Sequence, residues 1–363
     1  MSSRVSVVLG ALSIALTALA PVALAQQGTG DIRRTSDGRP DLSGTYDIAT
    51  LTPLQRPASF GDKLVLTEEE AAALAAGADS LERIFNIPDE RNEETGAPRE
   101  APPVGGDGSS GAAGNVGGYN SFWMDRGSAG FQIDGQWRTS IITDPPNGRQ
   151  PALTPEARTQ RASLAAFLRP NTGTAWWLEN DLNAPGPYDD LELRPHSERC
   201  LLGFGSTAGP PMLPILYNNL KRIVQTEDTV MILVEMVHDA RVIRLDQEHA
   251  PPEIRSWLGD SVGHWEGDTL VVDTTNFRDT PALGQASRNL HVVERFTRID
   301  AETLLYQFTV DDPTVWTAPW SGEYVWPASE HKVYEYACHE ANYSFGGILR
   351  GARVLEADAR EAR

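Results

Sequence analysis

Two short segments, far apart in the sequence, carry the side chains best suited to proton transfer. Glu235 and His238 lie in the first segment, and His339, Glu340 and Tyr343 lie in the second. Imidazole and carboxyl groups exchange protons in the range of pH where most enzymes work. We therefore expect His339 or His238 to act as a base, with Glu235 or Glu340 orienting it or donating a proton. Tyr343 is a further acid–base or hydrogen-bonding candidate.

Glu235 stands out because it interrupts the apolar run Met231–Val237. A carboxyl group in a buried strand needs a partner or stays protonated. One interpretation is a general acid or base with a raised pKa. The other is an ion pair with an arginine such as Arg222, Arg244 or Arg295, with no catalysis involved. His238 has a similar structural alternative, a histidine fixed by hydrogen bonds.

Motifs for metals and cofactors are missing from the sequence. A His-Glu-x-x-His motif starting at His339 would need histidine at position 343, which is Tyr343. The glycine-rich segment Gly203–Pro211 is not a phosphate-binding loop, because its two prolines prevent a helix from starting and no lysine follows. We therefore expect chemistry without a metal or a cofactor, of the lyase, isomerase or hydrolase type.

Four other residues are candidates for binding a substrate. They are Arg241, Asn342, Trp265 and Trp320. Tryptophan rings stack on sugars and aromatic ligands, although core packing is their commoner role. An alternative function is therefore non-catalytic binding of a small apolar or aromatic ligand, with Tyr119–Asp125 as a lid. A third is an envelope interaction protein that uses the Pro88–Gly118 segment as a tether.

The beginning of the chain predicts export, and export changes the meaning of the two cysteines. Arg4 precedes a mostly apolar run, Val7–Val22, and Ala23–Ala25 is a small-x-small cleavage site. The mature protein is then expected to be periplasmic or secreted. In such a compartment Cys200 and Cys338 predict one disulfide, with two unpaired buried thiols as the alternative. The bond would hold the two candidate segments side by side.

The charge balance limits the classes of partner. The formal net charge is −19, with 50 acidic and 31 basic residues. Nucleic acids and anionic membrane surfaces both require a basic face, so neither is an expected partner. No later segment is long and apolar enough to cross a bilayer. A small molecule is the partner that remains, and the sequence does not indicate an oligomeric state.

A strand over His331–Ala337 is predicted to present the second candidate segment. Short alternating runs predict further strands over 136–143, 216–226, 229–237, 241–245, 269–275, 290–299 and 303–310. Helices are predicted over 67–77, from a Thr-x-x-Glu capping box, and over 154–168, with proline at the first helical position. Closely spaced strands indicate a mainly β fold, an antiparallel meander forming a barrel or a sandwich.

The composition divides the chain into four parts. Residues 1–25 form the signal peptide, and 26–87 an N-terminal segment with a strand and a helix. Residues 88–118 form a flexible loop rich in Gly, Pro and Ser, and 119–363 form the β-rich domain that contains the disulfide. A pocket at the mouth of the barrel would be the ligand site.

Several motifs together resemble a family of uncharacterised exported bacterial proteins. The motifs are Glu-Arg-Cys at 198–200 followed by Gly-Phe-Gly at 203–205, His-Asp-Ala-Arg at 238–241, Trp-Glu-Gly-Asp-Thr-Leu-Val-Val at 265–272 and Tyr-Ala-Cys-His-Glu at 336–340. The third motif is also similar to strands of lipocalin-like barrels. The resemblance implies an exported β protein and no particular activity.

Overall fold

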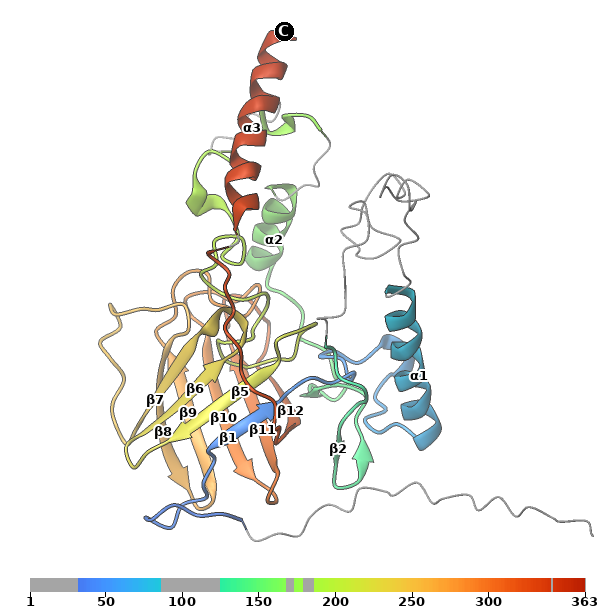
Figure 1. The fold of residues 1–363 in the computed structure, drawn as a ribbon, viewed down its shortest axis with the longest axis vertical. Coiled ribbons are helices and arrows are strands. Elements are labelled where there is room, and N and C mark those ends of the chain that lie inside the picture. The colour runs from blue at the N-terminus through green and yellow to red at the C-terminus, as the bar shows by residue number, and fades with distance from the viewer. Residues whose placement is uncertain (1–31, 86–124, 168–172, 179–185, 341, 363) are drawn as a thin grey trace, which may run out of the picture.

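A curled sheet of ten strands dominates the computed structural model (Figure 1), which describes residues 32–85, 125–167, 173–178, 186–340 and 342–362. In spatial order the strands are β1 (Gly44–Asp47), β5 (Leu220–Gln225), β6 (Thr229–Val234), β7 (Ala240–Leu245), β8 (Asp260–Glu266), β9 (Thr269–Thr275), β10 (His291–Arg298), β11 (Thr303–Asp311), β12 (Trp320–Pro327) and β4 (Ile142–Asp144). Neighbours are antiparallel except β7 and β8, which are parallel. The predicted mainly β, barrel-like fold is confirmed as a half-barrel.

The sheet curls until its first strand meets the end of β12. The Ser329 N–H donates to the Thr45 carbonyl over 2.8 Å, and Tyr46 forms an isolated bridge with Ala328. Side chains alternate strictly along β10, β11 and β12, so one face of each strand is buried inside the curl. A loop over residues 203–213 fills part of this interior: Met212 donates its N–H to the Tyr306 hydroxyl and accepts from Tyr324.

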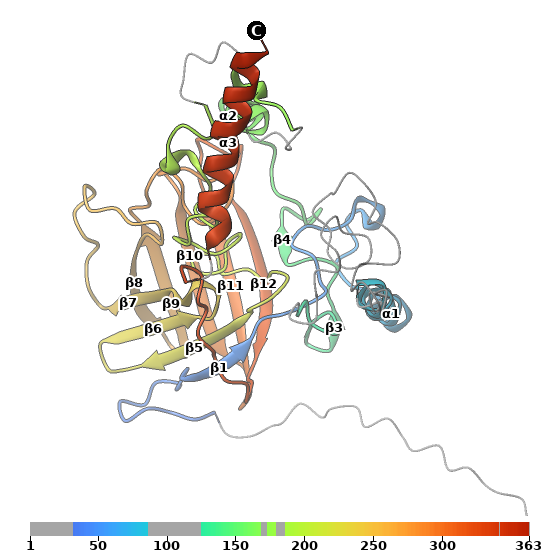
Figure 2. The same cartoon turned by 45° about the horizontal axis from the view of Figure 1, so that its top comes forward.

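Three helices lie outside the sheet: α1 (Glu68–Phe85), α2 (Pro155–Phe167) and α3 (Tyr343–Glu361) (Figures 1 and 2). A small hairpin pairs β2 (Gln132–Ile133) with β3 (Gln136–Trp137). The capping box at α1 is confirmed, because the Thr67 N–H donates to Glu70 Oε2 (2.8 Å) and the Glu70 N–H donates to Thr67 Oγ1 (3.2 Å). No helix among these described segments is long and apolar enough to cross a membrane.

Several predicted elements differ from the observed ones. The strand predicted over His331–Ala337 is wrong: the segment is mostly exposed and pairs with no strand, so its favourable β residues have no ladder to join. The predicted strand over 136–143 is divided between β3 and β4, and α1 continues past Gly77 to Phe85. The predicted signal peptide, the 88–118 loop and the Tyr119–Asp125 lid, except Asp125, lie outside the described residues.

Candidate functional site

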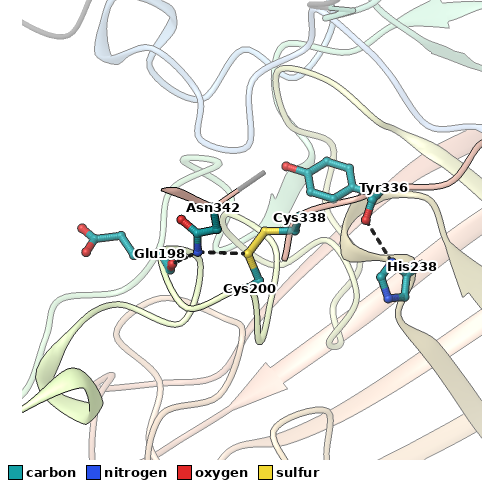
Figure 3. Close-up of a disulfide and its surroundings, with 6 residues drawn as sticks. All are labelled: Glu198, Cys200, His238, Tyr336, Cys338 and Asn342. Atoms are coloured by element: carbon teal, nitrogen blue, oxygen red, sulfur yellow. Dashed lines mark hydrogen bonds between the residues drawn. A yellow bond between two sulfur atoms is a disulfide. The ribbon is translucent and has the colours of Figure 1, made fainter. Parts of the chain in front are cut away.

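The predicted disulfide between Cys200 and Cys338 is present. Cys200 and Cys338 are bonded across 138 residues of chain, with their Cα atoms 5.8 Å apart. Figure 3 shows Asn342 beside the bond: its side-chain N–H groups donate to the Glu198 carbonyl (2.7 Å) and to Cys200 Sγ (3.4 Å). Asn342, a predicted substrate-binding residue, therefore already uses its amide to fix the disulfide loop.

Residues 328–338, which we call the strap, run from the seam between β1 and β12 to the disulfide. The Ser329 N–H bonded to Thr45 fixes one end of the strap, and Cys338 fixes the other. Between these ends, the Tyr336 carbonyl lies 3.1 Å from His238 Nδ1 (Figure 3). The strap is thus held against the turn that joins β6 to β7, the first of the two segments predicted to carry chemistry.

That turn has an unusual backbone. Strand β6 ends at Val234, and the short 3-10 helix η5 (Met236–His238) leads into β7. Val237 and His238 have φ angles of 59° and 43°. A positive φ is costly for a β-branched residue such as valine and is concentrated at functional sites. The Val234 N–H donates to the Asp239 carbonyl over 2.8 Å and closes the turn.

Lys221 lies next to this turn with its ammonium group entirely inside the protein. Its side chain is on the inner face of β5, in register with Tyr46 on β1 and Val234 on β6, and its relative exposure is 0%. Within the described residues, Lys221 Nζ has no hydrogen-bond partner. Burial lowers the pKa of Lys221 to about 7, although the charges of Glu235, Asp47 and Asp239 oppose that shift.

The three carboxyl groups near Lys221 are themselves perturbed. Burial raises the pKa of Asp239 to about 6, against the influence of His238 and Lys221. Asp239 Oδ2 is buried and has no hydrogen-bond partner among the described residues. Burial also raises the pKa of Asp47 and of Glu235.

Glu235 is anchored by the backbone and not by an arginine. Hydrogen bonds from the Leu220 and Tyr334 backbone and from the Asn218 side chain partly offset the rise in its pKa. The alternative of an ion pair between Glu235 and Arg222, Arg244 or Arg295 is wrong. Arg222 donates to Thr45, Arg244 pairs with Asp260, and Arg295 pairs with Glu266. The Glu235 backbone N–H also donates to the Leu220 carbonyl over 3.1 Å and so ties the turn to the start of β5.

The second predicted acid–base segment lies elsewhere. His339 and Glu340 are exposed on a turn after the disulfide, and Tyr343 is 83% exposed at the start of α3. No hydrogen bond or ion pair between described residues joins His339 to His238 or Glu235. The structure thus brings Glu235 and His238 to the strap and leaves His339, Glu340 and Tyr343 apart from them. The catalytic roles of all five residues stay predictions.

The remaining predicted binding residues serve packing. Arg241 is buried and forms an ion pair with Glu294, with Nη1 2.9 Å from Glu294 Oε1. Trp320 is fully buried, and its ring packs edge-on against Phe308 and Trp316. Trp265 is half-buried under the guanidinium of Arg39, 5.8 Å from the ring centre. The geometry of these three residues gives no support to a role in binding substrate.

Sequence reasoning missed Lys221 and Asp239. The sequence did contain a signal for Lys221. It is two residues from the apolar Ile223, so the two side chains share one face of the strand, and this face is the inward one in β5. The chain also contains only three lysines, Lys63, Lys221 and Lys332, against 28 arginines, so a lysine in an apolar strand merited attention. Asp239 was noted beside His238, but its burial depends on the backbone turn at Val237.

Comparison with known proteins gave no matching family model, no matching curated protein and no matching solved structure. The resemblance to exported bacterial proteins therefore stays a prediction. Within the described part of the chain, no group of three or more His, Cys, Asp or Glu side chains is arranged to hold a metal ion.

Proposed function

We propose that the protein is an exported enzyme that performs cofactor-free acid–base chemistry on a small organic molecule, with Lys221 as the base. The reaction belongs to the lyase, isomerase or hydrolase type, in which a proton is removed from carbon or from an attacking hydroxyl group. The observation that carries the proposal is the position of Lys221: fully buried, with no hydrogen bond from Nζ to any described residue, beside three carboxyl groups.

Physical chemistry gives the reason for this choice. A lysine that serves only as a countercharge is expected to hydrogen-bond its carboxylates, because burying an unbonded ammonium group is costly. Lys221 does not, and it is therefore held close to its neutral form, which is the form of a base. General bases are most effective when their pKa lies near the working pH. Lysines are tuned to this range by burial, as Lys221 is.

The neighbouring residues have supporting roles in this proposal. Asp239 accepts or returns the proton in this proposal, because it is close enough to interact with the charges of both Lys221 and His238 and its pKa is raised to about 6. Glu235 helps to position the first residues of β5, because its backbone N–H donates to the Leu220 carbonyl over 3.1 Å. The strap covers the β6–β7 turn and limits the access of water, which strengthens the electrostatic interactions beneath it.

A substrate-independent probe tests the proposal. In 5-nitrobenzisoxazole, a base removes the ring C–H proton, the N–O bond breaks, and a coloured cyanonitrophenolate forms. We expect the protein to accelerate this reaction roughly 10²–10⁴-fold over free amine, a normal range for a positioned base. The rate should rise with pH through a midpoint near 7, because only the neutral amine accepts a proton.

Matched variants complete the test. Lys221→Met keeps the length of the side chain and should abolish the acceleration, whereas Lys332→Met removes an exposed lysine of the strap and should not. Circular dichroism and thermal unfolding confirm that both variants are folded. Wild-type protein without any acceleration, or Lys221→Met with the wild-type rate, would contradict the proposal and favour non-catalytic binding of an apolar or aromatic ligand.

A further inference from the structure

A groove of about 810 Å³ lies between α3 and two described stretches of chain, 173–178 and 186–194. Its lining comes from elements that do not contribute to the Lys221 site: Trp177, Tyr188, Arg194 and the α3 residues Ser344, Gly347, Ile348, Gly351, Ala352, Val354 and Leu355, with Gly173. Figures 1 and 2 both show α3 extending away from the half-barrel. The volume is within the range of small-molecule sites, roughly 300–1,000 Å³.

Aromatic rings form one wall of the groove. The ring centres of Trp177 and Tyr188 are 4.6 Å apart, and the planes are tilted by 56°. Trp176 packs edge-on behind Trp177 with a centre distance of 5.8 Å, and both tryptophans belong to a small apolar cluster with Ala352 of α3. The wall is therefore fixed by packing, and its rings are positioned before any ligand arrives.

Two glycines open the opposite wall. A Cβ atom added at Gly347 or Gly351 would meet no other atom within 4 Å, so the surface of α3 is bare at both positions. They are one helical turn apart and face the same side, next to Ile348 and Leu355. A molecule in the groove would contact the aromatic residues of the lining and, at this strip, the backbone and alkyl groups of α3.

Two polar side chains of the lining, Trp177 and Arg194, already have partners within the protein. The Trp177 Nε1–H donates to Glu356 Oε1 over 2.8 Å. Arg194 donates from Nε and Nη2 to the two oxygens of Glu198, both at 2.8 Å, and its guanidinium lies 4.7 Å from the Tyr188 ring centre. The charge of Arg194 is thus neutralised where it borders the groove, and a charged ligand would lose hydration without gaining an ion pair.

We propose that this groove is a binding site for an uncharged, apolar molecule that contains an aromatic ring. The site is distinct from the Lys221 site and does not depend on its chemistry. Ring faces favour an aromatic ligand, and the internally paired Arg194 and Trp177 disfavour an anionic or strongly polar one. Binding is expected to be driven by removal of apolar surface from water on both walls.

The probe for the test is N-phenyl-1-naphthylamine, an uncharged aromatic amine that fluoresces in apolar surroundings. Titrated into the full-length, disulfide-bonded protein, it should show saturable binding with one equivalent bound. Gly351→Leu places a side chain in the groove and should weaken binding at least tenfold. Gly346→Leu is the matched control, because Gly346 is in the same helix outside the lining, where an added Cβ would meet only Arg350 Nη1 at 3.9 Å.

Both substitutions should fold, since neither glycine has a positive φ and leucine favours a helix interior over glycine. Lys221→Met should leave probe binding unchanged, which separates this inference from the proposed function. Equal binding to wild type and Gly351→Leu would overturn the inference, as would no saturable binding to the wild type. Sedimentation that shows probe binding only in a self-associated form would also overturn it, because the groove would then be covered by a second copy.

Discussion

His249, Asp260, Asp273 and His291 form a chain of hydrogen bonds on the outer side of the sheet. His249 Nδ1 lies 3.0 Å from Asp260, and its Nε2 lies 2.9 Å from Asp273 Oδ1; His291 Nε2 lies 2.8 Å from Asp273 Oδ2. The hydrogen bond to Asp273 raises the pKa of His291, and the pKa of Asp273 is lowered chiefly by its bond to His291. The pair is partly exposed, so solvent screens it.

The His291–Asp273 pair predicts a specific pH dependence. The contribution of His291 is fully present below the unfolded histidine pKa of about 6.5 and is lost as pH rises through its higher folded value. The contribution of Asp273 is present above an unfolded pKa of about 3.9 and is lost as pH falls through its lower folded value. The pair therefore stabilises the protein most between about pH 4 and 6.5.

The variant His291→Gln should lower the free energy of unfolding by about 0.2–1 kcal/mol at pH 5.5, the size of a screened ion pair, and by much less at pH 9. Urea unfolding at the two pH values measures both differences. The control is Arg288→Gln, whose exposed pair with Asp279 contains no histidine. If His291→Gln lowered the free energy of unfolding equally at both pH values, the protonation of His291 would not be coupled to stability, and the prediction would be contradicted.

At the scale of the elements, one buried cluster joins five neighbouring strands. Arg241 of β7 donates from Nε to Ser261 of β8 (3.0 Å) and from Nη2 to Thr274 of β9 (2.9 Å), and it pairs with Glu294 of β10. The Tyr306 hydroxyl of β11 donates to Glu294 Oε1 over 2.7 Å. Polar groups inside a sheet are tolerated when every member is bonded, and this cluster fixes the curl of the half-barrel.

Removing either Arg241 or Glu294 alone should lower the free energy of unfolding far more than removing both side chains together. Arg241→Met leaves the Glu294 carboxylate buried without its cation, and we expect a loss of about 3–5 kcal/mol in the free energy of unfolding. The double variant Arg241→Met/Glu294→Leu should lose less than the sum of the single variants. Guanidinium unfolding of all four proteins of the cycle measures the coupling. Strictly additive losses would mean that the two side chains do not interact.

Strands with clear alternation were predictable, and elements without it were not. The predicted strand over 303–310 agrees with β11 to within one residue, because Leu304, Tyr306, Phe308 and Val310 alternate with residues on the other face. Helix α3 was missed because Gly346, Gly347 and Gly351 lower its helix propensity, and packing of Trp177 against Ala352 supports it instead. The parallel pairing of β7 with β8 depends on a long connection that no local pattern reports.

At the scale of the whole molecule, the disulfide determines the position of the C-terminal part of the chain. It closes a loop of 138 residues, for which the chain-entropy model gives about 5 kcal/mol of stabilisation. The same bond fixes the end of the strap, whose Tyr336 carbonyl contacts His238. The covalent link thereby holds the strap, which contacts the β6–β7 turn at His238, to the loop around Cys200.

The sequence predicted the disulfide and the Glu235–Arg241 segment, but not the centre of the site. Cysteine number and a predicted export signal indicated the disulfide, and a carboxyl group in an apolar run drew attention to the second segment. To predict Lys221, one would need to know which face of β5 turns inward and that β1 pairs with β5 at this position. His339 and Glu340 seemed attractive because they follow Cys338, yet the chain turns there into solvent.

The titration of Lys221 tests the central claim most directly. With only three lysines in the chain, protein labelled with ¹³C at lysine Cε gives three signals, which the variants Lys63→Arg, Lys221→Met and Lys332→Arg assign. The structure predicts that the Lys221 signal titrates with a midpoint near pH 7. A midpoint near 10.4, the value of an ordinary lysine, would show that the ammonium group is hydrated or paired and would contradict its role as a base.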